Sequence, residues 1–409
     1  MENRKQLKWG GWSGTLAFDR SLSGFVREHI FGIAWIALTL LSLAVRWRGF
    51  PTESSDYQHF LLPWFQELKK SGGFAALGRP VGNYNFPYLT ILAALTYLPV
   101  PPLFSIKAVS ILFDYVGAAA GARIVYSLAS NKKKGELLAA AAWLCILFHP
   151  VVFINSAFWG QCDFIYVSFL LLCIKELIRE SYVPAFVWFS FALAFKLQAV
   201  FFLPVLLILY FTNRSHSVVH YLIIPLGVSV LSIPALVAGR PVTDIFKIYL
   251  EQTQFKQLVS HFPGLYYLLM GTYSQYAVVG ICLCVVFLGA GAVLWISYQK
   301  SVREENILLL GMWASSVCTY FLPSMHERYS FLTVVLSVLY MLSVRKDRLP
   351  AVLIAAGWSF TTMLTCVNAV NMANKIPVDY IALSAVNLVL VAAVTWLMIR
   401  RATENTSSD

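Results

Sequence analysis

Charged residues are scarce in this chain. Asp, Glu, Lys and Arg make up only 12% of its 409 residues, whereas hydrophobic residues make up 58%. This balance excludes an ordinary soluble domain and is typical of a polytopic membrane protein. Apolar stretches long enough to cross a hydrocarbon core recur from end to end, so no soluble domain of useful size is left over.

Cysteine is also sparse, and acids are outnumbered by bases. The seven cysteines mostly lie inside apolar runs, as in Leu144-Cys145-Ile146, without metal-type spacing, which favours buried thiols over a metal centre. The net charge of +11 invites a nucleic-acid-binding hypothesis, but the bases are spread along short loops. Membrane topology explains that spread better, so we expect no nucleic-acid partner.

The apolar runs predict an all-α fold of about twelve membrane-spanning helices. The predicted spans are 30–46, 104–127, 136–154, 161–178, 183–196, 199–211, 217–238, 276–297, 306–322, 329–344, 350–367 and 380–399. With both termini inside, the short cytoplasmic loops carry most of the bases, as the positive-inside rule requires. No small-residue cleavage site follows the first run at a convincing place, so we expect a cytoplasmic tail over 1–29 that leads into a retained helix. With the C-terminus also inside, residues 401–409 form a second predicted cytoplasmic tail.

Three segments complete the predicted topology. Residues 87–99 are apolar but too short for a span, and we expect a short or re-entrant piece there. Two long outer loops then remain, at 47–103 and 239–275. In the first, apolar residues recur at helical spacing in YQHFLLPWFQELKK, which predicts a helix lying in the membrane surface.

Polar residues gather at the outer ends of the predicted spans, where ionisable groups are costly to bury beside lipid. Four separate segments supply them, namely ESSDYQHF, NSAFWGQCDFIY, ALAFKLQAVFF and SMHERYSFL. The candidate site residues are Asp56, Tyr57, Gln161, Asp163, Lys196, Gln198, His326, Glu327 and Arg328. Their convergence on one side of the membrane indicates a functional site.

Structural interpretations compete with the functional one. Asp56 could cap the helix that follows it, and so could Asp163. Lys196 could extend to the lipid headgroups, and Glu327 with Arg328 could form a purely local ion pair. The sequence alone leaves these alternatives open.

A chemistry that uses one acid and several cations at membrane level is sugar transfer from a lipid phosphate. The leaving phosphate needs cations and hydrogen-bond donors, and the acceptor hydroxyl needs a base. Asp56 would be that base, while Lys196, Arg328 and His326 would hold the phosphate. Arginine suits bidentate phosphate contact, and Glu327 beside Arg328 could fix its orientation.

The same motifs resemble those of a known family. The acidic first outer loop, NYNFPYL, ILFDY, NSAFWGQCDFIY, FKLQAVFFLP and MHERY, in this order, resemble the GT-C glycosyltransferases over residues 30–400. The similarity is greatest to bacterial relatives of the second GPI-anchor mannosyltransferase. Single motifs such as WGQCD are moderately specific, whereas their order together is considerably more so.

The resemblance implies a transmembrane catalytic domain over 30–400 that uses a polyprenyl-phosphate sugar donor at the outer face, inverts the anomeric centre and generally needs no metal. By this resemblance Asp56 is the base and His326 belongs to the active site, whereas a role carries over less securely to Lys196 and Asp163. Oligosaccharyltransferases differ, because they have a second acidic pair for a metal and a large soluble domain. Protein O-mannosyltransferases typically show an Asp-Glu pair in the first loop, whereas Asp56 is followed by Tyr57.

Two rival classes remain at this stage. A secondary transporter or lipid flippase would place ionisable groups near the midplane on repeated, broken helices. Here only Asp114 lies well inside a predicted span, and we expect it to be a packing or hydrogen-bonding partner. A structural membrane subunit would not require Asp56. We expect membrane lipids and a lipid-linked or cell-envelope glycan acceptor as partners. The sequons at Asn213 and Asn405 fall on predicted inner segments, which favours a bacterial plasma membrane.

Overall fold

The computed structural model describes residues 17–214, 216–254, 256–299, 302–344, 346–370 and 376–404. Most of both predicted tails, with the sequon at Asn405, lies outside these residues. The chain forms two compact units, residues 1–44 and 45–409. The described part of the first unit belongs to helix α1 (Ala17–Gly49), which begins well before the predicted span at 30–46.

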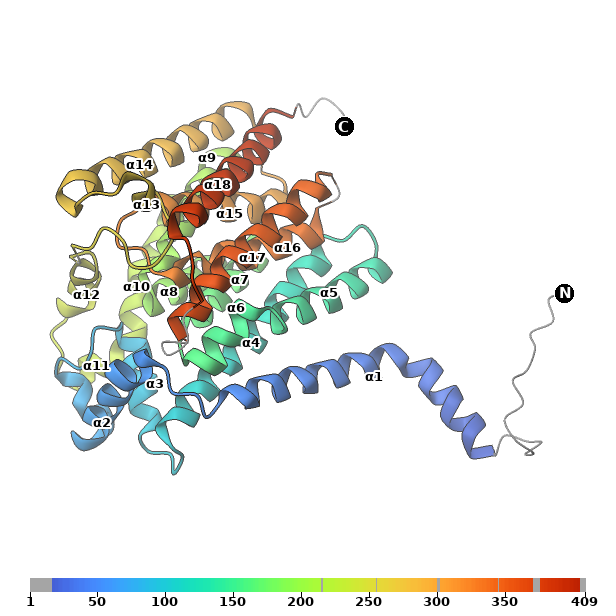
Figure 1. Ribbon diagram of the computed structural model, residues 1–409, viewed down its shortest axis with the longest axis horizontal. Coiled ribbons are helices and arrows are strands. Elements are labelled where there is room, and N and C mark those ends of the chain that lie inside the picture. The colour runs from blue at the N-terminus through green and yellow to red at the C-terminus, as the bar shows by residue number, and fades with distance from the viewer. Residues whose placement is uncertain are drawn as a thin grey trace. The chain divides into compact units, whose positions relative to one another are not determined.

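The second unit is built from helices (Figure 1). Its longer helices are α2 (Leu62–Lys70), α3 (Phe86–Leu95), α4 (Pro102–Ser127), α5 (Lys132–Leu147), α7 (Asp163–Ile178), α8 (Tyr182–Phe195), α9 (Leu203–Asn213), α10 (Ile223–Leu231), α12 (Asp244–Gln252), α14 (Tyr273–Tyr298), α15 (Glu304–Phe321), α16 (Phe331–Ser343), α17 (Arg348–Val370) and α18 (Tyr380–Thr403). Its shorter ones are α6 (Pro150–Phe153), α11 (Ile233–Val237) and α13 (Tyr266–Leu269).

Short π and 3-10 turns lead into several of these helices. The π turns are η1 (Tyr57–Leu61) and η3 (Ile154–Trp159), and the 3-10 turns include η2 (Gly73–Gly78), η4 (Leu197–Phe202), η5 (Val218–Leu222) and η6 (Glu327–Ser330). Among the described residues, the contacts of β type are two isolated bridges, which join Ser260 and His261 to His326. The all-α prediction is therefore confirmed.

Each of the twelve predicted spans contains helix in the structure. By length and composition, five described helices could cross a membrane, or up to six if a bent pair counts as one span. That pair replaces the single helix predicted at 136–154. The chain bends by 46° between α5 and the segment Pro150–Trp159, because a proline removes a backbone donor and clashes with the preceding turn.

The core of the second unit surrounds α15. All of its residues from Asn306 to Phe321 are buried, and it packs against α14, α16 and α18. A helix that is buried all round belongs at the centre of a bundle. A second apolar cluster joins α2, α3 and the start of α4, with Leu61, Phe65 and Leu92 among its buried members. The apolar face predicted for YQHFLLPWFQELKK thus packs partly inside the protein, although Phe60 on the same stretch is exposed.

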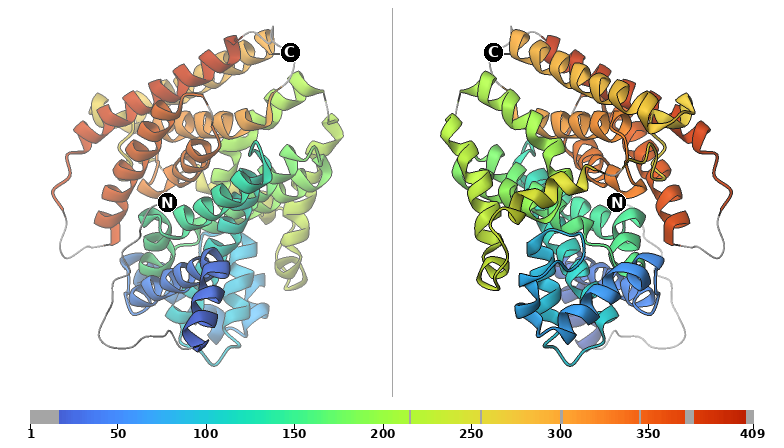
Figure 2. Two further views of the ribbon diagram at one scale, coloured as in Figure 1. Left: turned by 90° about the vertical axis from the view of Figure 1, so that its right-hand side faces the viewer. Right: turned by 90° about the vertical axis from the view of Figure 1, so that its left-hand side faces the viewer.

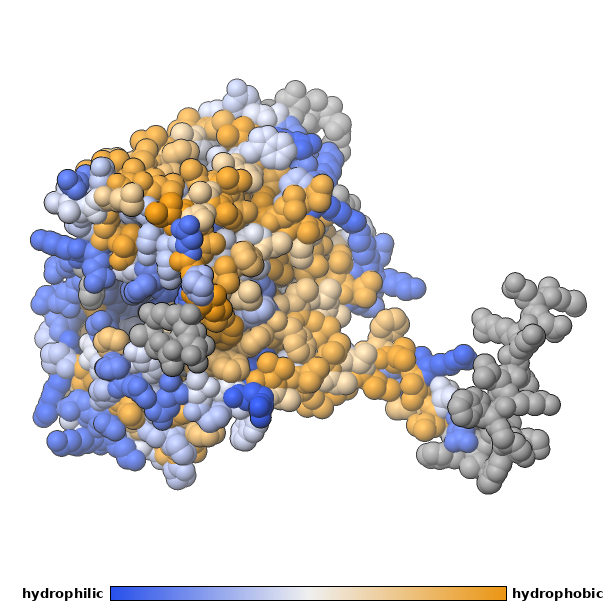
Figure 3. Space-filling model, in the orientation of Figure 1, coloured by the Kyte–Doolittle hydropathy of each residue, from blue (hydrophilic) through white to orange (hydrophobic). Residues whose placement is uncertain are grey.

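The surface is divided by polarity. Figure 3 shows hydrophobic side chains over α14, α17 and α18, and hydrophilic ones gathered at the end where α2, α11 and α12 lie. In both views of Figure 2, α2 and α3 lie at the opposite end from α14 and α18. The apolar segment 87–99, predicted to be a short or re-entrant piece, forms most of the ten-residue helix α3 and the turn after it.

Candidate active site

The loop that carries Asp56 is fixed to the π turn η3. The Ser54 hydroxyl donates to the Trp159 carbonyl at 2.7 Å and accepts from the Tyr57 amide at 3.2 Å. Ser54 therefore caps η1, and Asp56 makes no capping hydrogen bond. The capping interpretation of Asp56 is wrong, and its carboxylate is available for other contacts.

The WGQCD motif forms a tight turn between η3 and α7. Gly160 has a φ of +78°, in the left-handed region where glycine avoids the Cβ penalty. The backbone amide of Gln161 donates to the backbone carbonyl of Asn155 at 2.9 Å, which closes the turn. This conformation brings Trp159, Gln161 and Asp163 to one side of the loop.

The Asp56 carboxylate is held through one oxygen. Its Oδ2 accepts hydrogen bonds from Trp159 Nε1 at 3.1 Å and from Gln161 Nε2, and it lies 3.7 Å from Arg328 Nη1. Among the described residues, Oδ1 has no hydrogen-bond or ion-pair partner, and the side chain is 28% exposed. One oxygen is thus anchored while the other is open to a substrate.

Asp163 is the most deeply buried carboxylate of the site, with a side chain only 1% exposed. Its Oδ1 accepts from Lys196 Nζ, and its Oδ2 accepts from Asn155 Nδ2 at 2.9 Å and lies 3.6 Å from Arg328 Nε. Lys196 sits between α8 and η4 and is 11% exposed. Lys196 therefore does not extend to the lipid headgroups, and Asp163 makes side-chain contacts in place of the predicted helix cap.

Arg328 connects the two carboxylates. Its guanidinium contacts Asp56, Asp163 and the neighbouring Glu327, whose Oε1 is 3.3 Å from Nη1. It also lies over the Trp159 ring, 5.3 Å from the centroid, in a cation–π contact. Arg328 Nε has no hydrogen-bond partner among the described residues. The local-pair interpretation of Arg328 and Glu327 is thus incomplete, because the same guanidinium also forms ion pairs with Asp56 and Asp163.

His326 and Glu327 complete this side of the site. His326 Nδ1 lies 3.9 Å from Glu327 Oε2, and the backbone of His326 bridges to Ser260 and His261 of the second long loop. Burial, helped by the charges of Arg328 and Lys196, lowers the pKa of His326 to about 3. The imidazole is therefore neutral near pH 7 and can both donate and accept hydrogen bonds. Burial also raises the pKa of Glu327.

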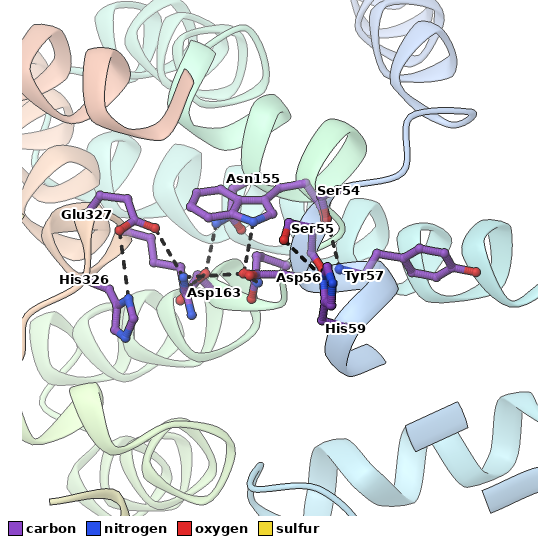
Figure 4. A network of polar contacts seen from close by, with 12 residues as sticks. Ser54, Ser55, Asp56, Tyr57, His59, Asn155, Asp163, His326 and Glu327 are labelled. Atoms are coloured by element: carbon purple, nitrogen blue, oxygen red, sulfur yellow. Dashed lines mark hydrogen bonds and ion pairs between the residues drawn. The ribbon is translucent and has the colours of Figure 1, made fainter. Parts of the chain in front are cut away.

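Figure 4 shows how these residues lie relative to one another. His326 and Glu327, then Asp163, then Asp56 follow one another across the network. Tyr57 points away from it, and its side chain is buried in the apolar cluster with Leu61 and Phe65. The structure thus does not bring Tyr57 into the site. Gln198 is buried on η4, and its Oε1 has no hydrogen-bond partner among the described residues.

Three residues that were not predicted also contribute to the site. Trp159 donates to Asp56, and Asn155 donates to Asp163. These two donors lie in the NSAFWGQCDFIY segment that also contains Gln161. Tyr84 donates to Gln161 Oε1 at 3.0 Å, and Lys196 Nζ lies 5.8 Å from the centroid of its ring. Burial raises the pKa of Tyr84, so its hydroxyl stays protonated and can donate. NYNFPYL contributed to the family resemblance, but nothing in its composition singled out Tyr84.

Asp114 has the structural role that we expected. Its Oδ2 accepts from Arg46 Nε at 2.8 Å and from Ser156 Oγ at 2.6 Å, and it is fully buried. This pair joins α4 to α1 and to η3 within the second unit. Among the described residues, no group of three or more His, Cys, Asp or Glu side chains is placed to hold a metal ion.

The site thus offers an anchored carboxylate, two buried cations and neutral hydrogen-bond donors at one end of a helical membrane fold. The fold is of the GT-C type. No family model matches the sequence, and no curated protein matches it. Among solved structures, the chain is similar to ArnT from Cupriavidus metallidurans, crystallised with undecaprenyl phosphate bound. The TM-score is 0.54 at 11% identity, over 92% of this chain and 78% of that one.

Proposed function

We propose that this protein is an inverting glycosyltransferase that transfers a hexose from a polyprenyl-phosphate donor to a lipid-linked or cell-envelope glycan. The observation that carries the proposal is the Asp56 carboxylate, which is anchored through Oδ2 and open at Oδ1 beside the Arg328 guanidinium. The likeness to ArnT, which binds undecaprenyl phosphate, supports a lipid-phosphate donor. The motif resemblance favours mannose or glucose as the sugar and a bacterial plasma membrane, with the site facing outside.

In the proposed reaction the acceptor hydroxyl gives its proton to Asp56 Oδ1. The acceptor oxygen then forms a bond to the anomeric carbon from the face opposite the phosphate. The bond between that carbon and the phosphate oxygen breaks, and the polyprenyl phosphate leaves with the electron pair. Attack from the opposite face inverts the anomeric centre, so a β-linked donor gives an α-linked product.

The cations of the site suit the leaving phosphate. Lys196 and Arg328 are both only 11% exposed. Cations in such a water-poor setting stabilise developing negative charge more strongly than they would in water. Asp163 keeps these two cations buried and in place when no donor is bound. His326 can add a neutral hydrogen bond to the sugar or the phosphate, since its side chain is 39% exposed.

The test is sugar transfer by purified protein in detergent. A panel of labelled polyprenyl-phosphate hexoses is offered with a lipid extract as acceptor, with and without chelator. We expect transfer from one donor and a loss of about 10²- to 10⁴-fold in Asp56→Asn, the range for removal of a general base. Glu53→Gln is the matched control, because Glu53 lies three residues away in the same loop and is exposed.

The outcomes separate the candidate classes. Chelator-resistant transfer from one donor, lost in Asp56→Asn and kept in Glu53→Gln, would support the proposal and name the sugar. Folded protein that neither binds nor consumes any donor would refute it. A secondary transporter or lipid flippase would then be the better reading, and flux across vesicles would be measured next.

A further inference from the structure

Lys107 is a buried lysine that the proposed reaction does not use. It lies near the start of α4, and its side chain is 0% exposed. Its Nζ donates to the carbonyls of Gly49 at 2.8 Å, Phe50 at 3.2 Å and Thr52, and lies 3.4 Å from that of Phe158. A buried ammonium needs such acceptors, because an unpaired buried charge costs several kcal/mol.

These carbonyls belong to two segments that meet at Asp56. The first is the end of α1 and the turn after it, where Gly49, Phe50 and Thr52 lead directly to Ser54 and Asp56. The last carbonyls of a helix have no partner within the helix, and a cation there satisfies them and the negative end of the helix dipole. Lys107 therefore binds the C-terminal end of α1, just before the loop that carries Asp56.

The second segment is η3 with the turn after it. Phe158 directly precedes Trp159, whose indole donates to Asp56. A Cβ added to Gly160 would lie 3.6 Å from Lys107 Cε, so the stem of the lysine lies beneath this turn. A Cβ added to Gly49 would lie 2.8 Å from the Ala157 carbonyl oxygen, which shows how closely the two segments approach. One side chain thus contacts both the loop of Asp56 and the segment that binds its carboxylate.

We propose that Lys107 is a positioning residue that sets the place of Asp56 by joining the end of α1 to η3. This inference rests on the proposed function, in which Asp56 is the base. Lys196 and Arg328 belong to other elements and are both held by Asp163 at the start of α7, so loss of Lys107 displaces the base more than it displaces the phosphate-binding cations. Lys107 therefore affects proton removal from the acceptor and not donor affinity.

The test uses Lys107→Met, which keeps most of the stem and removes the charge. Gln299→Met is the matched control, because Gln299 is buried and donates to the carbonyls of Arg401, Ala402 and Glu404 at the C-terminal end of α18. We expect kcat to fall about 10- to 100-fold in Lys107→Met, as a displacement of about 1 Å can cause. The donor KM and the number of donor sites per protein stay within twofold of wild type, and Gln299→Met keeps its kcat.

The same substitution is then made in the Asp56→Asn background. If Lys107 acts through Asp56, a variant that already lacks the base loses little further activity. We therefore expect Lys107→Met to lower kcat less than twofold in this background. Equal losses of kcat in both backgrounds, or an unchanged kcat in Lys107→Met alone, would overturn the proposal. A general folding defect would instead lower the number of donor sites and would also overturn it.

Amide hydrogen exchange tests the positioning without any activity. We expect residues 50–58 to exchange at least tenfold faster in Lys107→Met, because the amides of Phe50 and Thr52 bond to carbonyls at the end of α1 and that of Gln58 bonds to the Ser54 carbonyl. Unchanged exchange there refutes the positioning role. If wild-type protein transfers no sugar, the proposed function fails, and the exchange result still decides whether Lys107 fixes the loop.

Discussion

The ion-pair cluster around Asp163 makes the most quantitative prediction. Asp163→Asn keeps the shape of the side chain and removes its charge, which leaves Lys196 and Arg328 without their shared, 1% exposed carboxylate. A unit charge about 4 Å away contributes about 4 kcal/mol at an effective dielectric constant of 20. Removing one partner of a buried pair typically costs about 3–5 kcal/mol, and we expect a loss in that range.

The assay is thermal unfolding in detergent, followed with a thiol-reactive dye. The chain suits this dye because five of its free cysteines, Cys162, Cys173, Cys284, Cys318 and Cys366, are buried. With about 2 °C per kcal/mol for a large chain, the expected fall in Tm is about 6–10 °C. Unfolding of a membrane protein is commonly irreversible, so all variants are compared at one scan rate.

Two further variants make this prediction specific. Asp244→Asn removes the partner of Arg240 from a more exposed pair at 2.8 Å, and such pairs contribute at most about 1 kcal/mol. Among the described residues, Asp163 is the carboxylate that pairs with Lys196, whereas Arg328 keeps Asp56 and Glu327. The double variant Asp163→Asn with Lys196→Met removes the cation left without a partner, so it should unfold at a higher temperature than Asp163→Asn alone. If the Tm of Asp163→Asn equals that of Asp244→Asn, the charge cluster does not stabilise the protein as argued.

Three other predictions concern the surroundings of Asp56. Trp159→Phe removes the indole hydrogen bond to Asp56 and keeps a ring near Arg328, so we expect kcat to fall about 10- to 100-fold with little change in Tm, measured by transfer and dye unfolding. The pKa of His326 is about 3 in the folded protein and 6.5 for an unperturbed histidine, so the unfolded chain binds the proton more tightly and stability falls as pH drops below about 6.5. His326→Gln should flatten the fall of Tm between pH 6.5 and 4. Gly49→Ala places a Cβ 2.8 Å from a backbone oxygen and should cost about 1–3 kcal/mol, whereas Gly24→Ala, with nothing within 4 Å, should not lower the Tm.

Hydropathy predicted where the helices occur but not how they bend. Each apolar run contains helix because a chain in lipid must satisfy its backbone internally. The bend between α5 and α6 depends on Pro150, which the apolar count of 136–154 did not weigh. Helix α1 begins at Ala17, well before the predicted residue 30. The polar residues over 17–29 end the apolar run, although the helix continues through them.

The sequence predicted those site residues that are charged side chains in apolar surroundings. Lys196 and Arg328 were predicted as site residues because a cation beside lipid is costly unless it has a partner or a function. The structure brings both to Asp163. Tyr57 was included as a neighbour of Asp56, and the local π turn directs its ring into the core instead. Trp159 was not predicted because an aromatic residue in an apolar run carries no signal until its partner is known.

The buried charges of α4 also bear on how the chain is assembled in the membrane. Lys107 and Asp114 lie on one helix, and their partners come from α1 before it and from the segment 156–158 after it. On the translocon scale, a charge near the centre of a lone helix, as Asp114 is in α4, costs about 3 kcal/mol. Helix α4 should therefore be poorly retained in the bilayer until the next hairpin has been synthesised. Truncations ending at residue 130 or 181, compared for membrane integration, would show whether biogenesis waits for that later segment.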